Sequence, residues 1–274
     1  MRKTKELLVK IVYDVFIHNS NGICMRALNN HVYIIAFFAM GIIVGAGFFQ
    51  LYISLNQAGS APILSLDQMY KNAIEDAIIA KPSEIYGGLT SVVESNGNLS
   101  WQGNSGSQRV LVVTFTKYAS SYPVGETLNT TWGETWVTVV PEIKTFFKDH
   151  VNSDSNVTLR ALQLLGLPPN NSNTYFVEMW VNPQSLFRPT ADNEINDTVA
   201  ELSFPASVTA EYKTWFNNNI IYSYYPERYP WTRLGYTYDW GSNASPVGLS
   251  EFVLKQNSLI MVQSVTPTID YLTG

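Results

Sequence analysis

The sequence predicts an α+β protein in which a single-pass transmembrane helix is followed by one extracytoplasmic domain of mixed helices and strands. Three observations support this fold class. Only 14% of the 274 residues are charged and 46% are hydrophobic, a balance that indicates a membrane segment. Residues 32–53 contain the long apolar run. Residues 66–274 mix helical and strand-like patterns without a regular βαβ order.

The transmembrane helix is predicted over residues 32–53. The run Val32–Tyr52 has no charged residue over 21 positions, which is long enough to cross a bilayer as a helix. Residues 1–31 hold five Lys and Arg residues, whereas the twenty residues after Leu55 hold one. The positive-inside rule therefore places the N-terminus in the cytoplasm and the C-terminal domain outside. Because a cleaved signal peptide has a shorter apolar region, of about 7–15 residues, we expect an uncleaved signal anchor.

The cytoplasmic segment, residues 1–31, contains an amphipathic pattern over residues 4–18. Two interpretations remain open, a helix that lies on the inner leaflet and an ordinary juxtamembrane helix. Within the membrane span, Gly41 and Gly45 are four positions apart, and small residues at this spacing let two helices approach closely. The expected partners of the span are thus the lipid bilayer and, through these two glycines, a second copy of the chain.

A linker over residues 54–65 leads to a predicted helix over 66–80, which Ser65 and Gln68 start with capping-box spacing. Apolar, β-branched runs predict two buried strands. A proline in the first-turn position starts the next helix, and a Gly-Leu-Pro-Pro sequence stops the one after it. In chain order these elements are strands 109–118 and 134–140 and helices 141–150 and 157–165.

The second half of the exterior domain is predicted to contain a strand, a helix and three closing strands. Aromatic and β-branched residues at alternating positions indicate the strands, and the sequence KQNS joins the last two as a hairpin-like turn. The predicted elements are strand 174–181, helix 210–218 and strands 232–240, 249–254 and 259–265. No internal repeat or second domain boundary interrupts residues 66–274.

The composition of the exterior part limits its partners and its compartment. It holds 12 Lys and Arg residues against 20 Asp and Glu residues, so nucleic acid is not an expected partner. The one cysteine, Cys24, precedes the membrane span, which leaves the exterior domain without disulfides. A secreted eukaryotic domain of this size usually contains some, so we expect a prokaryotic cell envelope.

Several enzyme classes lack their residues in the exterior part. His150 is its sole histidine, and no G-x-S-x-G motif accompanies it, which argues against a Ser-His-Asp hydrolase. Without cysteine, this part cannot supply cysteine catalysis or the usual set of zinc ligands. Neither a phosphate-loop motif nor a dinucleotide-binding motif occurs, so no cofactor is predicted.

Asp192, Glu194 and Asp197 cluster in a predicted loop. Hard oxygen ligands gathered in this way can hold calcium, although the spacing and the glycine of an EF-hand are missing. A solvated acidic loop is favoured over an ion site. These three residues are therefore the metal-ligand candidates, and no metal is expected.

Glu178, Asp239 and Glu251 are unusual because each lies inside a predicted strand beside large apolar residues. Burying an unpaired carboxylate is costly, so each should meet a cation or line a cleft. The favoured interpretation is a structural pairing of each acid with an arginine. The alternative is a catalytic pair of carboxylates with different pKa values that acts as acid and base on a glycosidic bond.

Residues 248–265, GLSEFVLKQNSLIMVQSV, look like the last hairpin of ADP-ribosyltransferase folds, in which a catalytic glutamate precedes an apolar strand. The likeness covers fewer than twenty residues. Leu249 stands where that family usually has Glu or Gln two positions before the glutamate, and no arginine or Ser-Thr-Ser element completes the pattern. We therefore do not adopt this resemblance.

Residues 229–241, YPWTRLGYTYDWG, contain five aromatic residues with an arginine and an aspartate. In an extended strand over 232–240, Arg233 and Asp239 would lie about 20 Å apart and could not pair, so Glu178 or Glu251 on a neighbouring strand would suit Arg233. The aromatic face has two interpretations, an exposed platform and a buried core, of which burial is favoured. The ligand-binding candidates of the exposed platform are Arg233, Tyr236, Tyr238 and Trp240.

Taken together, the residues favour a membrane-anchored binding or assembly module that recognises a protein or a glycan outside a prokaryotic plasma membrane. The main support is the absence of the usual catalytic residue sets. The alternative is a carboxylate-dependent glycan-processing enzyme that uses two of Glu178, Asp239 and Glu251. Two of these acids about 5–10 Å apart in an open cleft would favour the enzyme.

Overall fold

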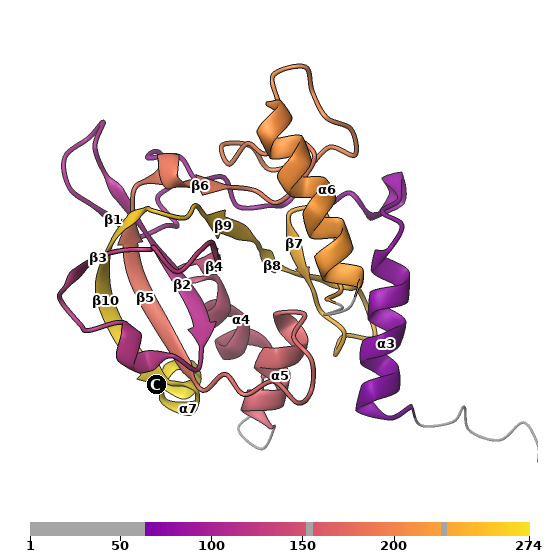
Figure 1. Cartoon of the computed structure of the whole chain (residues 1–274). Coiled ribbons are helices and arrows are strands. Elements are labelled where there is room, and N and C mark those ends of the chain that lie inside the picture. The colour runs from indigo at the N-terminus through magenta and orange to yellow at the C-terminus, as the bar shows by residue number, and fades with distance from the viewer. Residues whose placement is uncertain (1–63, 152–155, 226–228) are drawn as a thin grey trace, which may run out of the picture. The chain divides into compact units, whose positions relative to one another are not determined.

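The computed structural model describes residues 64–151, 156–225 and 229–274 (Figure 1). Leu64–Gly274 is the second of the two units into which the chain divides, and it is described by itself. The predicted transmembrane helix over 32–53, with Gly41 and Gly45, lies outside the described residues. Within the described ranges, no helix has the length and apolar character that a membrane span requires.

The second unit is built on an antiparallel sheet of eight strands. Its strand order is β3-β10-β5-β2-β4-β9-β6, and β1 pairs with β2 beside this path. A separate pair, β7 and β8, forms a two-stranded sheet. The strands are β1 (Trp101–Gln102), β2 (Arg109–Thr116), β3 (Thr127–Asn129), β4 (Thr135–Val139), β5 (Tyr175–Val181), β6 (Leu186–Phe187), β7 (Tyr236–Tyr238), β8 (Val247–Ser250), β9 (Phe252–Leu254) and β10 (Leu259–Pro267).

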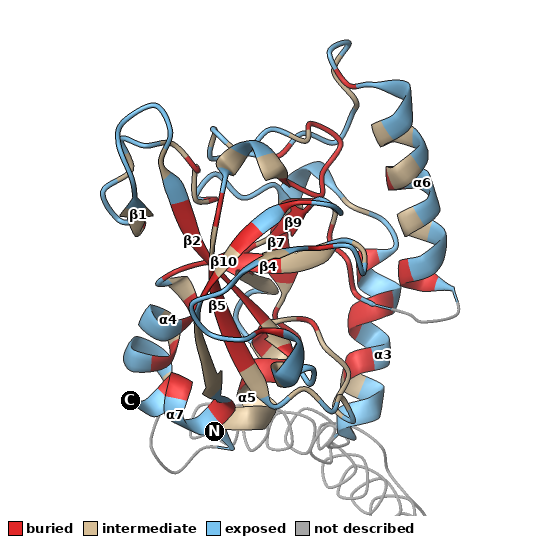
Figure 2. Ribbon diagram, turned by 60° about the vertical axis from the view of Figure 1, so that its left-hand side comes forward, coloured by how far each residue is buried: buried red, intermediate tan, exposed pale blue. Residues whose placement is uncertain are grey.

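The central strands are apolar on both faces because both faces are covered. Along β2, Val110 and Val112 point into one core with Val177 and Met179 of β5. The alternate residues of β2 contribute to a second core with the helices, as the two-residue period of a strand requires. Figure 2 shows the buried residues concentrated along these central strands. The mixture of helices and strands that the sequence predicts is therefore confirmed.

Helices cover one face of the large sheet and flank the small one. Ile143 of α4, Leu164 of α5 and Tyr271 of α7 pack on the second core. α3 and α6 lie side by side next to β7 (Figure 1), where Ala77 of α3 and Tyr224 of α6 share a core cluster. The α-helices are α3 (Leu66–Ala77), α4 (Glu142–His150), α5 (Val157–Leu164), α6 (Ala210–Tyr224) and α7 (Thr268–Thr273), and the short 3₁₀ turns are η1 (Pro82–Glu84), η2 (Ala119–Ser121) and η3 (Pro183–Ser185).

The predicted strand over 232–240 is wrong in its extent, since only Tyr236–Tyr238 is a strand. Arg233 and Gly235 have left-handed backbone conformations, with φ of 59° and 78°, and such residues interrupt an extended chain. A Cβ atom on Gly235 would lie 2.7 Å from Cδ of Arg188. Tight packing against this arginine therefore requires glycine at that turn.

The predicted strand over 249–254 is two strands that belong to different sheets. β8 ends at Ser250 and pairs with β7, whereas β9 begins at Phe252 and pairs with β4 and β6. Glu251 is the single residue between them. It therefore occupies the point at which the chain passes from the small sheet to the large one.

Candidate functional site

A cavity lies where β2 and β4 separate. The two strands pair at only two positions, Val112 with Val139 and Val113 with Thr138. Beyond these pairs, the first half of β4 pairs with β9 and the last residues of β2 pair with β5 alone. Both diverging strand segments line a cavity of about 630 Å³, together with the α5–β5 connection, the end of α6 and residues 229–231.

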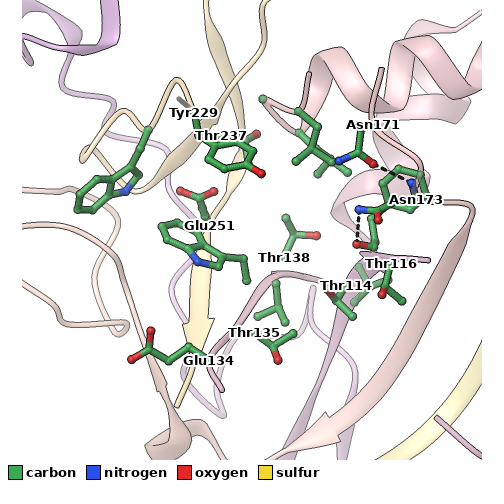
Figure 3. Close-up of a pocket in the computed structure, with 18 of the residues that line it drawn as sticks. Thr114, Thr116, Glu134, Thr135, Thr138, Asn171, Asn173, Tyr229, Thr237 and Glu251 are labelled. Carbon is green, nitrogen blue, oxygen red and sulfur yellow. Dashed lines mark hydrogen bonds between the residues drawn. The ribbon is translucent and has the colours of Figure 1, made fainter. Parts of the chain in front are cut away.

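The cavity wall is mainly aromatic and neutral polar. Nine lining residues are aromatic, among them Trp132, Trp136 and Trp231, and ten are Thr, Ser or Asn. Three are charged, namely Lys117, Glu134 and Glu251. Figure 3 shows Glu251, Thr237 and Tyr229 on one side and Asn171, Asn173 and Thr116 on the other. Apolar rings with a few hydrogen-bonding groups are the usual lining of small-molecule sites.

Glu251 is the carboxyl group of this wall that has no partner. Among the described residues, none donates a hydrogen bond to its side chain and no cation pairs with it. Burial alone raises the pKa of Glu251 to about 8, because a low-dielectric surrounding disfavours the charged form. The group is therefore mostly protonated at neutral pH. A perturbed acid that lines a cavity is a functional-site candidate.

The backbone around Glu251 is held on both sides. Its own amide donates to the carbonyl of Gly235 at 2.9 Å, and the amide of Ser250 donates to Glu142 Oε2 at 2.9 Å. Phe252, the next residue, is fully buried. The Arg188 guanidinium lies 5.6 Å from its ring centre. These contacts fix the position from which the Glu251 side chain enters the cavity.

Two further lining residues carry unpaired donors. Asn219 Nδ2 and Trp231 Nε1 are both buried, and neither has a hydrogen-bond partner among the described residues. Leaving a buried donor unpaired costs about 1–3 kcal/mol, so native structures keep few such groups. Both atoms are almost fully covered by the protein, so a ligand in the cavity does not contact them in this structure.

The opposite wall is fixed by its own hydrogen bonds. Where β2 has left β4, Asn173 Nδ2 donates to the carbonyl of Phe115 at 2.9 Å, and the amide of Asn173 donates to Asn171 Oδ1 at 2.8 Å. On the other side, Thr237 Oγ1 donates to the carbonyl of Leu164 at 2.7 Å. The cavity is therefore bounded by segments that are tied to one another rather than by separate loops.

Glu178 and Asp239, the other two acids predicted to matter, do not line this cavity. Glu178 accepts hydrogen bonds from Lys144 Nζ at 2.9 Å and Tyr271 Oη at 2.8 Å. Burial acts to raise the pKa of Glu178, but these hydrogen bonds and the Lys144 charge outweigh it and lower the pKa. Asp239 accepts two hydrogen bonds from Arg160, one of them at 2.8 Å. Each of these acids thus has a cationic partner.

The ligand-binding candidates within residues 229–241 are mostly buried or bonded to neighbouring backbone and side-chain groups. Tyr236 and Trp240 are only 2% and 5% exposed, so they form no exposed platform. Tyr238 lines the cavity, and its hydroxyl donates to Asp76 Oδ2 at 2.9 Å. Arg233 binds the carbonyl of Ile78 after α3 at 2.7 Å rather than Glu178 or Glu251. The prediction that Arg233 and Asp239 do not pair is confirmed.

The acidic cluster has a partner of its own. Asp197 accepts a short hydrogen bond from fully buried Arg188. Asp192 is also buried, and its burial raises its pKa. Within the described ranges, no three His, Cys, Asp or Glu side chains gather closely enough to hold a metal ion. Asp192, Glu194 and Asp197 therefore do not form a shared ligand set.

Comparison with known proteins identifies no relative: no family model, no curated protein and no solved structure matches the chain. The site is therefore interpreted from its own geometry. The sequence identified Glu251 and Tyr238 as candidate site residues but not Asn219 or Trp231. Whether the side chains of Asn219 and Trp231 have hydrogen-bond partners depends on distant segments, and no local sequence pattern indicates it.

Proposed function

We propose that residues 64–274 form a binding domain whose cavity takes a polyhydroxylated ligand, a short segment of a glycan. The observation that carries this proposal is Glu251, a carboxyl group without a partner among the described residues, on the wall of a cavity lined by aromatic rings and neutral polar side chains. A ligand hydroxyl group that bonds Glu251 removes the cost of leaving this carboxyl group unpaired.

The chemistry of the wall supports a sugar. Aromatic rings such as those of Trp136 and Trp231 stack on the apolar faces of sugar rings, while threonine and asparagine side chains can bond hydroxyl groups. A volume of about 630 Å³ lies within the range of roughly 300–1,000 Å³ that is usual for small-ligand sites. A glycan segment therefore suits this enclosed site better than the flat face of a folded protein does.

The proposed setting is the outer face of a prokaryotic plasma membrane. Residues 32–53 would anchor the chain with its N-terminus in the cytoplasm, and Gly41 and Gly45 would allow two anchors to associate. Glycans are exposed on that side of the membrane. Alkaline extraction of membranes checks the anchor, since an integral protein stays in the membrane pellet and a peripheral one leaves it.

Hydrolysis by a pair of carboxylates is the less supported alternative. Such enzymes need a second acid close to the first, and neither Glu178 nor Asp239 lines the cavity. Each is bound to a cation, Lys144 or Arg160. Glu134, the other lining acid, accepts a hydrogen bond from Trp215 at 2.8 Å.

Binding of soluble oligosaccharides to the full chain in lipid nanodiscs, measured by calorimetry, tests the proposal. Trp136→Phe makes one lining ring smaller and keeps an aromatic residue. We expect it to weaken binding about 3- to 10-fold, because the sugar loses part of its stacking surface. The matched control is Trp180→Phe, because Trp180 donates to Gln263 at 2.8 Å and lies outside the cavity lining.

We expect Trp180→Phe to bind as the parent chain does. Equal losses in the two variants would show that the effect is not specific to the cavity. A panel in which no oligosaccharide binds would contradict the proposed function.

A further inference from the structure

The charges around the cavity are unevenly matched. Of the two lining acids, Glu134 is hydrogen bonded to Trp215 and Glu251 has no partner. Among the described lining residues the one cation is Lys117, which is exposed and lies 5.2 Å from the ring centre of neighbouring Tyr118. The described part of the cavity wall therefore does not supply the charge that would balance an ionised Glu251.

Arg188 and Arg160 are already paired with other acids. Arg188 packs behind Gly235 and Phe252, and its guanidinium binds Asp197 and the carbonyl of Thr90. Arg160 is bound to Asp239. No charged group contributes to the raised pKa of Glu251, which burial alone produces. Among the described residues, no side chain is placed to neutralise this carboxylate.

A carboxyl group in such a place stays protonated or gains a cation from outside. An ammonium group of a ligand would supply that cation. The aromatic lining favours the same group, because a desolvated cation is attracted to the faces of tryptophan and tyrosine rings. Trp136 and Trp231, two of the lining rings, pack edge to face with centres 6.1 Å apart.

We infer that the ligand carries a protonated amine that pairs with the Glu251 carboxylate. This inference rests on the proposed function, since it assigns the ligand to the glycans that bear free amino groups. The recognised class is then an amino sugar that is not acetylated. A neutral sugar would leave Glu251 as a protonated donor and gain no ionic attraction.

Two oligosaccharides that differ only at the amine make the test. We measure binding of the glucosamine tetramer and the N-acetylglucosamine tetramer to the full chain in nanodiscs by calorimetry at pH 6. We expect the glucosamine tetramer to bind at least about 10-fold more tightly, the effect of one charge-assisted hydrogen bond. Because Glu251 gives up its proton when the ion pair forms, binding should also release up to about one proton.

Proton release is obtained by repeating the titration in two buffers of different ionisation enthalpy. Glu251→Gln should abolish both the preference for the amine and the proton release, and should leave binding of the acetylated tetramer within about threefold. Binding of that tetramer also shows that the variant is folded. The control is Glu75→Gln, an exposed acid outside the cavity lining, which should keep the preference and the proton release.

Equal affinity for the two tetramers, or release of no proton on binding the glucosamine tetramer, would contradict the inference and leave the proposed function standing. Binding of neither tetramer would contradict both. Because proton release is measured on the unchanged chain, the inference can fail even if Glu251→Gln does not fold.

Discussion

Three acidic residues that look alike in the sequence have different surroundings at the scale of the single residue. Glu178 is held by Lys144, Tyr271 and Ser264, and Asp239 is held by Arg160. Glu251 has no such partner and lines the cavity. The role of each carboxyl group therefore follows from the side chains that face it rather than from its position in a strand.

The raised pKa of Glu251 predicts how stability depends on pH. The pKa of Glu251 is about 8 in the folded protein, whereas that of a solvent-exposed glutamate is 4.5. Below pH 4.5 the proton is bound in both states and costs nothing. As the pH rises from about 4.5 to 8, the unfolded chain loses this proton and the folded chain keeps it, so stability falls. Glu251→Gln removes this loss and should stabilise the fold by on the order of 4 kcal/mol at pH 8.5 relative to pH 4.5.

Chemical unfolding followed by tryptophan fluorescence measures this difference, since all seven tryptophans lie between residues 101 and 240. Glu178→Gln is the control with the opposite sign. In the parent chain the pKa of Glu178 is lowered by folding. The ionised Glu178 therefore stabilises the fold above the pKa of the unfolded state, and this stabilisation is lost as the pH falls. The same pH dependence in the parent chain and in Glu251→Gln would contradict the assignment.

At the scale of elements, the site depends on where strands change partners. β4 leaves β2 for β9, and the chain passes from β8 to β9 at Glu251. Gly235 supports this junction, because its carbonyl accepts a hydrogen bond from the backbone amide of Glu251. The cavity thus lies where neighbouring strands of the large sheet separate and take other pairing partners.

Gly235→Ala should disturb this junction. At φ of 78°, an added Cβ would lie 2.7 Å from Arg188 Cδ and 2.9 Å from Leu89 Cδ1, so strain and overlap add. We expect a loss of about 2–4 kcal/mol in the free energy of unfolding. Gly125→Ala is the matched control, because φ is 83° and the added Cβ would meet nothing within 4 Å. It should cost only the backbone strain, about 1–2 kcal/mol. Equal losses in the two variants would contradict the role of packing at Gly235.

The elements that local pattern describes were predictable. The capping-box spacing at Ser65 places the start of α3, where Gln68 N donates to Ser65 Oγ at 3.2 Å. The apolar runs place β2, β4 and β5 within two residues. Asparagines 217–219 have low helix propensity, so the predicted helix over 210–218 ends before the observed one, which continues to Tyr224.

What could not be predicted depends on contacts between distant segments. The turn at Arg233 and Gly235 is fixed by the side chain of Arg188, and the break at Glu251 is fixed by the pairing of β9 with β4 and β6. For the site, the sequence identified Glu251 as an unusual acid. It could not predict that Lys144 would pair with Glu178 and that Arg160 would pair with Asp239.

At the scale of the whole molecule, residues from β2, β4, α6 and the β7–β8 region converge on one cavity. The lining residues are spread over more than 100 positions of the chain, from Val113 to Glu251. Among the described residues few charged side chains reach the wall, and Glu251 lacks a partner. This arrangement supports the proposed binding site.

A crystal structure of the full chain with the glucosamine tetramer tests the central claim most directly. The account predicts that the sugar lies in the cavity, with an amine within about 3.5 Å of the Glu251 carboxylate, about the limit for a hydrogen bond. A tetramer bound elsewhere on the surface, with the cavity empty of sugar, would contradict it.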